Sequence, residues 1–260
     1  MSFFFKLAKT AGKINIPAPL KNKLLALLVK TNNALVDMKK SSGAPSTGLQ
    51  ELDEVIIRSR QRTVINDHLP LLFIESLRSS PKLIVELGVE SGQSTFALER
   101  VARLCKSKLV SVDIADCSDV CRWKDWIFIK RNDLEFAKTF PDWCRENNIT
   151  PQIDILFIDT DHLYEQTLNE IRLWFPYLSK KAKVFFHDSN VRPVYRRKDG
   201  SIGTAPDYQR GVTRALEEYL GYSFHEEEDF IAHKNGWLIR HCANCNGFTM
   251  LEKLEAPVDR

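Results

Sequence analysis

Short apolar runs alternate with amphipathic segments from residue 81 onward. Runs of aliphatic and β-branched residues bounded by turn residues are typical of buried parallel strands. Segments with helical spacing lie between most of them, which is the βαβ pattern of a sheet with helices on both faces. The five predicted strands are Leu83-Ile84-Val85 with Glu86 at its end, Leu109–Asp113, Trp126–Lys130, Ile153–Asp159 and Lys183–Asp188.

The helical spacing is clearest in three places. Gln93–Leu104 and Gly211–Leu220 each have apolar residues along one face, and Tyr164–Leu178 has them at alternating intervals of four and three. After the last helix, Tyr222–Ala232 and Gly236–His241 flank a turn and predict an antiparallel hairpin at the edge of the sheet. We therefore expect an α/β protein with a doubly wound, mostly parallel sheet.

Charge and composition divide the chain into three parts. Residues 1–48 form a basic arm and linker, because residues 1–40 hold eight lysines against one acid, Asp37. Residues 49–80 predict helices that end at Pro81. Residues 81–260 form the main domain, which is slightly acidic and long enough to bury one sizeable core.

The basic arm has two interpretations. Phe3-Phe4-Phe5 and Leu24–Val29, with lysines beside them, fit peripheral contact with an anionic membrane. Alternatively, the arm packs on the domain or on a second subunit of a homo-oligomer, with its lysines in water. The apolar runs are too short to span a bilayer or to act as a secretory signal.

The six cysteines bear on metal binding and on location. Cys242 and Cys245 have the spacing of a metal knuckle, but a second C-x-x-C pair is absent from the sequence. Free thiols in a reducing compartment fit this pattern better than structural zinc. We therefore expect a cytoplasmic protein.

The turn after the first predicted strand contains Gly88 and Gly92, with three residues between them. This departs from the dinucleotide fingerprint, in which a G-x-G pair is followed by a third glycine. Glu86 at the strand end suits a cationic amino-acid group better than a polyphosphate. The sequence E-x-G-x-x-x-G resembles motif I of the class I S-adenosylmethionine-dependent methyltransferases. On this stretch alone, an ordinary βα turn of any doubly wound protein remains the alternative.

A second resemblance covers Asp154–Glu165 and Val184–Asn190. Both stretches are similar to the family of macrolide-sugar and aminocoumarin O-methyltransferases and cephalosporin-hydroxylase-like proteins, whose pattern is roughly I-D-G-D-H-x-Y-E followed by h-H-D. Thr160 stands where glycine is usual. The resemblance implies a Rossmann-like sheet of seven strands and O-methyl transfer from S-adenosyl-L-methionine. It also implies that the helices of residues 49–80, which precede the first strand, cover the substrate site.

The same resemblance implies where the cofactor binds. Asp113 would accept hydrogen bonds from the ribose, and Asp133 would lie beside the adenine. Asp113 could instead cap the following loop, and Asp133 is also a natural N-cap for a helix over Leu134–Thr139. A bulkier residue at Gly88 is expected to block the approach of the turn to the cofactor. The predicted cofactor-binding residues are Glu86, Gly88, Gly92, Ser94, Asp113 and Asp133.

Asp159 and Asp188 end neighbouring predicted strands and could share one divalent cation. Hard oxygen ligands favour magnesium or manganese over zinc. His162 fits a general base near neutral pH or a polar residue at a helix start, and Asp161 fits an N-cap better than a ligand. In a metal-free alternative, Asp159 or Asp161 removes the proton, because neighbouring carboxylates can raise one pKa.

These features predict an S-adenosylmethionine-dependent O-methyltransferase that acts on a hydroxyl of a sugar, glycoside or small natural product. A nucleotide-dependent oxidoreductase and a non-catalytic member of the fold are the alternatives. The slightly acidic body argues against a nucleic-acid substrate. A basic loop could contact an anionic acceptor or only water, and its cations are Arg192, Arg196, Arg197, Lys198 and Arg210.

Overall fold

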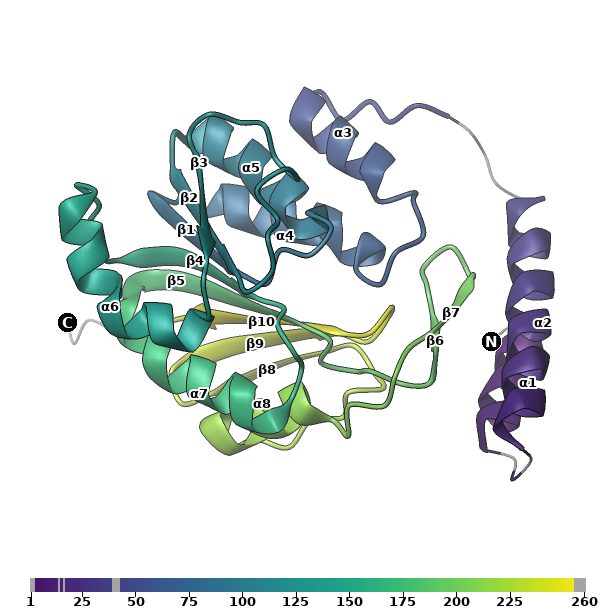
Figure 1. Ribbon diagram of the computed structural model, residues 1–260. Coiled ribbons are helices and arrows are strands. Elements are labelled where there is room, and N and C mark those ends of the chain that lie inside the picture. Colours follow the sequence, from purple (N-terminus) through teal and green to yellow (C-terminus); the bar gives the residue numbers. More distant parts are fainter. Residues whose placement is uncertain (1–2, 14, 16, 39–42, 255–260) are drawn as a thin grey trace.

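The computed structural model describes residues 3–13, 15, 17–38 and 43–254. Its centre is an eight-stranded sheet with the order β3-β2-β1-β4-β5-β10-β9-β8 (Figure 1). Strands β3 to β5 in this order are parallel, and β10, β9 and β8 continue the sheet with antiparallel pairing. The strands are β1 (Leu83–Leu87), β2 (Lys108–Asp113), β3 (Trp126–Lys130), β4 (Ile153–Ile158), β5 (Leu178–His187), β8 (Phe230–Lys234), β9 (Trp237–Cys242) and β10 (Phe248–Lys253).

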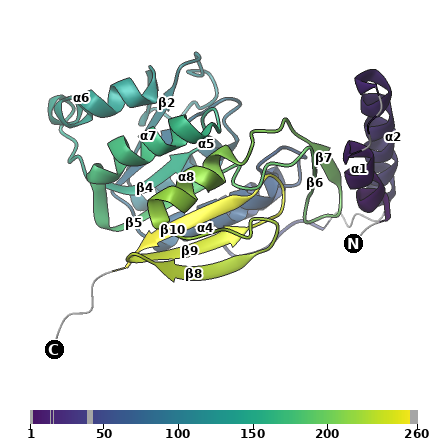
Figure 2. The same ribbon diagram turned by 90° about the horizontal axis from the view of Figure 1, so that it is seen from below.

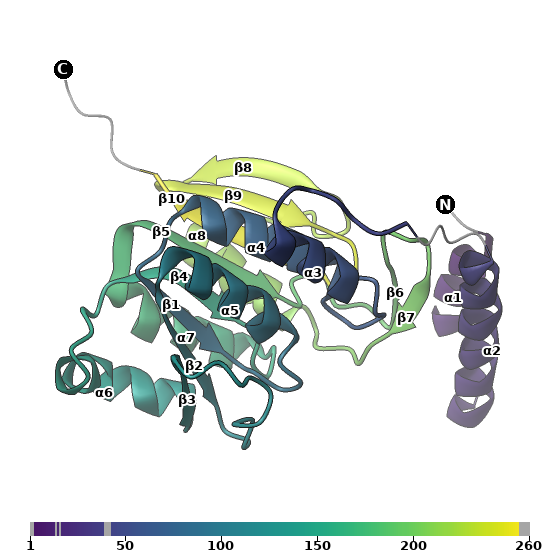
Figure 3. The same cartoon turned by 90° about the horizontal axis from the view of Figure 1, so that it is seen from above.

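Helices cover both faces of this sheet (Figures 2 and 3). Helices α6, α7 and α8 pack on one face, and α3, α4 and α5 pack on the other. Two short 3₁₀ helices, η1 (Asn66–His68) and η2 (Phe175–Tyr177), precede α4 and follow α7. The α-helices are α1 (Phe3–Lys13), α2 (Ala18–Asp37), α3 (Gln50–Arg58), α4 (Leu69–Arg78), α5 (Gln93–Cys105), α6 (Asp133–Glu146), α7 (Tyr164–Trp174) and α8 (Gly211–Leu220).

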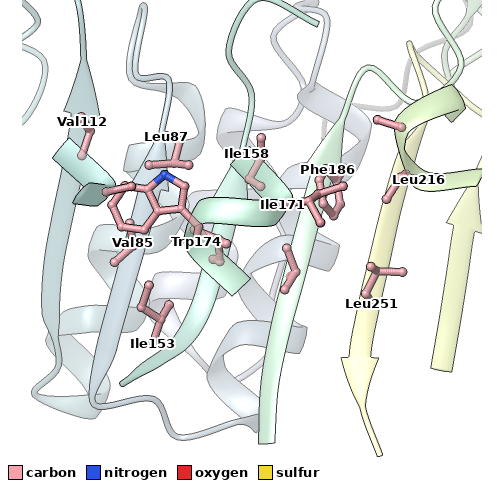
Figure 4. Close-up of a cluster of buried hydrophobic side chains, with 14 of the residues drawn as sticks. Val85, Leu87, Val112, Ile153, Ile158, Ile171, Trp174, Phe186, Leu216 and Leu251 are labelled. Carbon is pink, nitrogen blue, oxygen red and sulfur yellow. The ribbon is translucent and has the colours of Figure 1, made fainter. Parts of the chain in front are cut away.

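The core follows from the two-residue period of the strands. In β1, Leu83, Val85 and Leu87 face α6, α7 and α8, whereas Ile84 belongs to the cluster under α4 and α5. Figure 4 shows the apolar cluster on the side of α6, α7 and α8, in which Trp174 of α7 lies over the side chains of the parallel strands. Every residue of β1 is buried, as expected for a central strand with helices on both faces.

The doubly wound fold, the five parallel strands, the edge hairpin and helix α8 are confirmed. The strand count is wrong by one, because β10 inserts between β5 and β9. The predicted helix over Tyr164–Leu178 also ends early, at Trp174. Pro176 lacks the backbone N–H that a continuing helix needs, so the chain turns through η2 and enters β5 at Leu178.

The basic arm forms a helical hairpin at one side of the molecule. Helices α1 and α2 lie side by side and contact the small β6–β7 hairpin, β6 (Val194–Arg196) and β7 (Ile202–Thr204) (Figure 1). Asn33 fixes this contact, since its Nδ2 donates to Ile202 O at 3.0 Å and its Oδ1 accepts from Ile202 N at 2.8 Å. Among the described residues, no helix has the length and apolar character needed to cross a bilayer.

Candidate active site

A cavity of about 690 Å³ opens where the parallel strands end. Its lining includes Gly88 after β1, Asp113 at the end of β2, Asp159 after β4 and Asp188 after β5. Ligands of doubly wound proteins bind at this edge of the sheet, and the volume suits a small molecule. The segments Thr63–Ile65 and Thr204–Pro206 complete other parts of the wall.

Gly88 is held in a conformation that only glycine fits. Its φ is +86°, and an added Cβ would lie 1.9 Å from the carbonyl oxygen of Asp159. The sequence predicted that this turn approaches the cofactor, but the nearest crowding comes from the backbone after β4. Gly92 also has a positive φ, +70°, and an added Cβ there would meet Val120 at 2.9 Å.

Asp113 ties the glycine turn to the end of β2. Its Oδ2 accepts hydrogen bonds from the backbone N–H groups of Val89 (2.8 Å) and Glu90 (3.1 Å), and its Oδ1 accepts from Ala115 N (2.8 Å). Burial would raise the pKa of Asp113, but these donors lower it below its usual value. Asp113 therefore caps two loops as an anion while lining the cavity.

Glu86 lies outside the cavity lining. Alternation along β1 places the Glu86 side chain on the same face as Ile84, toward α5, where Ser111 and Thr95 donate to it at 2.6 and 2.9 Å. Burial raises its pKa to about 7 against the effect of these hydroxyl donors. Ser94, in the first turn of α5, does line the cavity.

Asp133 lines the cavity, and the N-cap of α6 is Asn132 instead, whose Oδ1 accepts from Glu135 N at 3.1 Å. The N-cap alternative for Asp133 is therefore wrong. Asp133 is the first residue of the helix and is buried beside Gln166, which donates to both Asp133 Oδ1 and Glu170 Oε1 at 3.0 Å. Its predicted contact with the adenine stays a prediction.

Glu170 is a buried carboxyl group that sequence reasoning missed. The Thr160 hydroxyl donates to its Oε1 at 2.5 Å, so the threonine that replaces the usual glycine has a partner on α7. Burial and the neighbouring Asp133 raise the pKa of Glu170 to about 8. The departure at Thr160 was the available signal for this pair.

Asp159, His162 and Asp188 form a cluster at the ends of β4 and β5, which pair in the sheet. One ligand atom from each residue lies within 4.8 Å of the others. His162 Nε2 is 3.0 Å from Asp188 Oδ2, and its Nδ1 is 3.8 Å from Asp159 Oδ1. Within the described residues, this is the one group with the geometry for a metal ion.

Two members of the cluster have strained backbones. His162 has φ +62° and Asp188 has φ +56°, both in the left-handed region that non-glycine residues rarely adopt. Such strain is found preferentially at functional sites, where the surrounding structure holds it in place. Nothing in the sequence pattern indicated it.

His187 is a second imidazole in contact with this cluster. It is buried, with Nδ1 at 3.1 Å from Asp159 Oδ1 and 3.4 Å from Asp188 Oδ1 and with Nε2 at 3.2 Å from Val64 O. Burial would lower the pKa of His187, but the two carboxylates raise it to about 9. Sequence reasoning gave it no role, although it stands beside Asp188 in the h-H-D pattern.

The electrostatics of the other members follow from the same contacts. Burial would raise the pKa of Asp188, yet His187 and His162 lower it to about 2. Burial would lower the pKa of His162, yet the hydrogen bond to Asp188 and the charges of both carboxylates raise it. The ring of Tyr208 lies edge-on to His162, with centroids 4.9 Å apart.

Asp161 is neither an N-cap of α7 nor a member of the cluster. Leu163 holds the N-cap position, and Asp161 Oδ1 accepts from Leu163 N at 3.0 Å in the turn before it. The N-cap prediction for Asp161 is wrong by two residues. Its carboxylate lines the cavity.

The basic loop between residues 192 and 210 serves mainly structural contacts. Arg192 and Arg210 pair with Glu226 at 2.8 and 2.5 Å, and buried Arg197 donates to Thr63 O at 3.0 Å. In the described part of the chain, the cavity lining contains Arg131 and none of the five cations of this loop. All six cysteines are described and are free thiols, including Cys242 and Cys245.

Comparison with known proteins supports the resemblance seen in the sequence. Residues 85–189 match the family model of a methyltransferase domain. The structure of MycE from the mycinamycin biosynthetic pathway, in complex with Mg, SAH and mycinamycin VI, has a TM-score of 0.50 and 17% identity; it covers 84% of this chain and 57% of that chain. An O-methyltransferase from Bacillus cereus in complex with SAH has a TM-score of 0.50 and 15% identity over 86% of this chain and 99% of that chain.

At these identities, the likeness to solved structures shows the fold. The chain spans only 57% of the MycE chain, so that enzyme has a large part with no counterpart here. No curated protein matches the chain by sequence. The predicted Rossmann-like fold of class I methyltransferases is confirmed.

Proposed function

We propose that this protein is an S-adenosylmethionine-dependent O-methyltransferase for a small polar acceptor, because residues 85–189 match the family model of a methyltransferase domain and the chain has the class I methyltransferase fold. One observation carries the proposal. A single cavity is lined both by the glycine turn tied to Asp113 and by the Asp159-His162-Asp188 cluster. The first fits a cofactor site, and the second fits acid–base chemistry beside it.

The cofactor would bind along the turn. S-adenosylmethionine supplies an activated methyl group, so the protein must mainly orient the acceptor oxygen toward it. Asp113 holds Val89 and Glu90 in place and is anionic, as a group facing a ribose should be. Asp133 and Ser94 line the same cavity and complete the proposed contacts.

A divalent ion fits the cluster. Asp188 Oδ1 is buried and accepts no hydrogen bond within the described residues, although His187 Nδ1 lies 3.4 Å away. Two carboxylates from neighbouring strands suit magnesium or manganese, and Asp159 and Asp188 would hold the ion. When bound, such an ion lowers the pKa of an acceptor hydroxyl.

His162 would remove the proton from the acceptor. Its imidazole lines the cavity, and the two carboxylates beside it stabilise the imidazolium that forms. His187 has a positioning role, since it contacts Asp159 while Val64 O fixes its other nitrogen. In the metal-free alternative, Asp159 or Asp161 takes the proton instead.

The acceptor class is a further part of the proposal. MycE was crystallised with mycinamycin VI of the mycinamycin biosynthetic pathway, which supports a small natural product as the acceptor; the resemblance of residues 154–165 and 184–190 favours a hydroxyl on a sugar or glycoside. The cavity volume suits an acceptor of that kind beside the cofactor. The alternatives are a nucleotide-dependent oxidoreductase and a non-catalytic protein of the same fold. Each would respond differently from a methyltransferase to S-adenosylhomocysteine and NADH.

A thermal-shift comparison of S-adenosylhomocysteine with NADH tests the cofactor. A ligand at 100 times its Kd stabilises the native state by about 2.7 kcal/mol, which raises Tm by several degrees. We expect this shift with S-adenosylhomocysteine and no shift with NADH. The opposite pattern would favour an oxidoreductase, and no shift with either would favour a non-catalytic protein.

The same protein then tests the mechanism, with labelled methyl transfer to a panel of glycosides as the assay. His162→Ala should slow turnover by roughly 10²- to 10⁴-fold without changing S-adenosylhomocysteine affinity. His233→Ala, an exposed histidine on β8, is the matched control. EDTA should abolish turnover and magnesium restore it, whereas chelator-insensitive turnover would support the carboxylate base.

A further inference from the structure

The hairpin of α1 and α2 has an inner and an outer side. Its inner side packs Ala8, Ala11 and Leu25 against Val194 and Ile202 of the β6–β7 hairpin. Figures 1 and 3 show that the two helices lie beyond β6 and β7, at the margin of the molecule. The outer side is therefore available to a partner.

Large apolar side chains are exposed on this outer side. Leu20 and Leu27 of α2 are 57% and 61% exposed, and Phe3 of α1 is 70% exposed. In α2, Leu20, Lys23, Leu27 and Lys30 recur at intervals of three and four, which places them on one face. In α1, exposed Phe3, Lys6 and Leu7 share a face in the same way.

The outer side also has charge of one sign. In the described part of the chain, Lys6, Lys13, Lys23 and Lys30 are exposed and have no ion-pair partner. The one acid of the hairpin, Asp37, pairs with Arg62 at 2.8 Å. Leucine and lysine therefore alternate on a surface that offers a partner cations and apolar groups but no anions.

This composition selects among partners. A symmetric contact between two copies would bring the same lysines face to face without acids to compensate them. A purely electrostatic partner would leave Phe3, Leu20 and Leu27 in water. An anionic bilayer surface satisfies both groups at once, since lysine heads reach the lipid phosphates while the apolar side chains enter the boundary with the acyl chains.

We propose that the outer side of the α1–α2 hairpin binds the surface of an anionic lipid bilayer. The contact is peripheral, with the helices lying in the plane of the interface. It does not depend on the proposed methyl transfer, because the outer side carries none of the apolar contacts that the inner side makes with β6 and β7. Attraction between lysines and anionic headgroups falls as salt rises.

Co-sedimentation of the full chain with vesicles tests this proposal. We expect binding to vesicles of phosphatidylcholine mixed with phosphatidylglycerol and none to phosphatidylcholine alone. Replacing Lys6, Lys13, Lys23 and Lys30 by Gln should lower the partition coefficient by roughly 10²- to 10³-fold. Leu20→Ser with Leu27→Ser should weaken binding even at low salt, because it removes the apolar contribution.

The matched control carries the same change of charge on the main domain. It replaces Lys82, Lys108, Lys124 and Lys180, which are all exposed, by Gln and should keep its binding. All substituted side chains point to water, and equal melting temperatures would verify the folds. Absence of binding to anionic vesicles, or equal loss in the control, would overturn the proposal. Sedimentation velocity adds a third outcome that would overturn the proposal. In that outcome the wild-type protein is a dimer that does not bind vesicles, and the variant with Leu20→Ser and Leu27→Ser is a monomer.

Discussion

A comparison of Gly88→Ala with Gly48→Ala separates two energetic costs of replacing a glycine, both of which apply at Gly88. The first is the left-handed backbone, with φ +86°, and the second is the carbonyl oxygen of Asp159, which would lie 1.9 Å from the new Cβ. Gly48 has the same φ of +86° and no atom within 4 Å of an added Cβ. Gly48→Ala is therefore a control that carries the first cost alone.

The expected magnitudes follow from this difference. A left-handed backbone costs a non-glycine residue about 1–2 kcal/mol, so Gly48→Ala should lower the free energy of unfolding by that amount. At Gly88 the methyl group also forces the end of β1 away from the backbone after β4. Overpacking of this kind costs about 1–3 kcal/mol more, so Gly88→Ala should lose about 2–5 kcal/mol in total.

Urea unfolding followed by circular dichroism measures both variants. Equal m values would allow the free energies to be compared directly. If Gly88→Ala lost no more stability than Gly48→Ala, the backbone contact between Gly88 and Asp159 would not be the reason for glycine there. The result also matters for cofactor binding, because a loss of affinity in a Gly88 variant follows from the displaced Asp159 as readily as from a blocked turn.

Two further predictions concern buried ionisable groups. Glu170 has a pKa of about 8 in the folded protein and about 4.3 in the unfolded chain. Between about pH 4.3 and 8 the unfolded chain loses the proton first, so the free energy of unfolding of the wild type should fall as pH rises. Glu170→Gln should flatten this decline in urea unfolding at pH 5 and pH 8, and an unchanged slope would contradict the assignment. Lys183 Nζ lies 2.7 Å from Glu75 Oε2, with both side chains 7% exposed, so Lys183→Met should cost about 3 kcal/mol by leaving a buried carboxylate. Adding Glu75→Leu should recover most of that loss. Arg240 Nη1 lies 3.2 Å from Glu75 Oε1, and equal stability of the single and double variants would show that Arg240 compensates the carboxylate.

Parallel strands explain why part of the site could be predicted from the sequence. Because β4 and β5 are adjacent and run the same way, the acids that follow them must meet at one edge. The strand pattern alone was therefore enough to predict that Asp159 and Asp188 lie close together. Glu86 shows the limit of this reasoning, because alternation along β1 points its side chain to the same face as Ile84, toward α5 and away from the cavity.

Other features depend on contacts between distant segments. Strand β10 has a short apolar run, and its place between β5 and β9 is set by partners more than sixty residues away in β5. The h-H-D pattern and the unusual Thr160 were local signals for His187 and Glu170. Their burial beside Asp159 and Asp133, however, depends on the assembled fold. The positive φ of His162 and Asp188 likewise follows from the assembled loops.

The acids around the cavity are held in different ways, and this difference suits a divided task. Asp113 is kept anionic by backbone N–H groups, whereas Asp133 shares a buried site with Glu170, whose raised pKa favours one proton between them. Asp159 and Asp188 instead face two imidazoles. Environments that push pKa values apart separate binding groups from proton-transfer groups. This contrast supports placing the proposed proton transfer at the ends of β4 and β5, where imidazole and carboxylate are 3.0 Å apart, and the proposed cofactor at the β1–β2 end, which is suited to holding a neutral or cationic ligand.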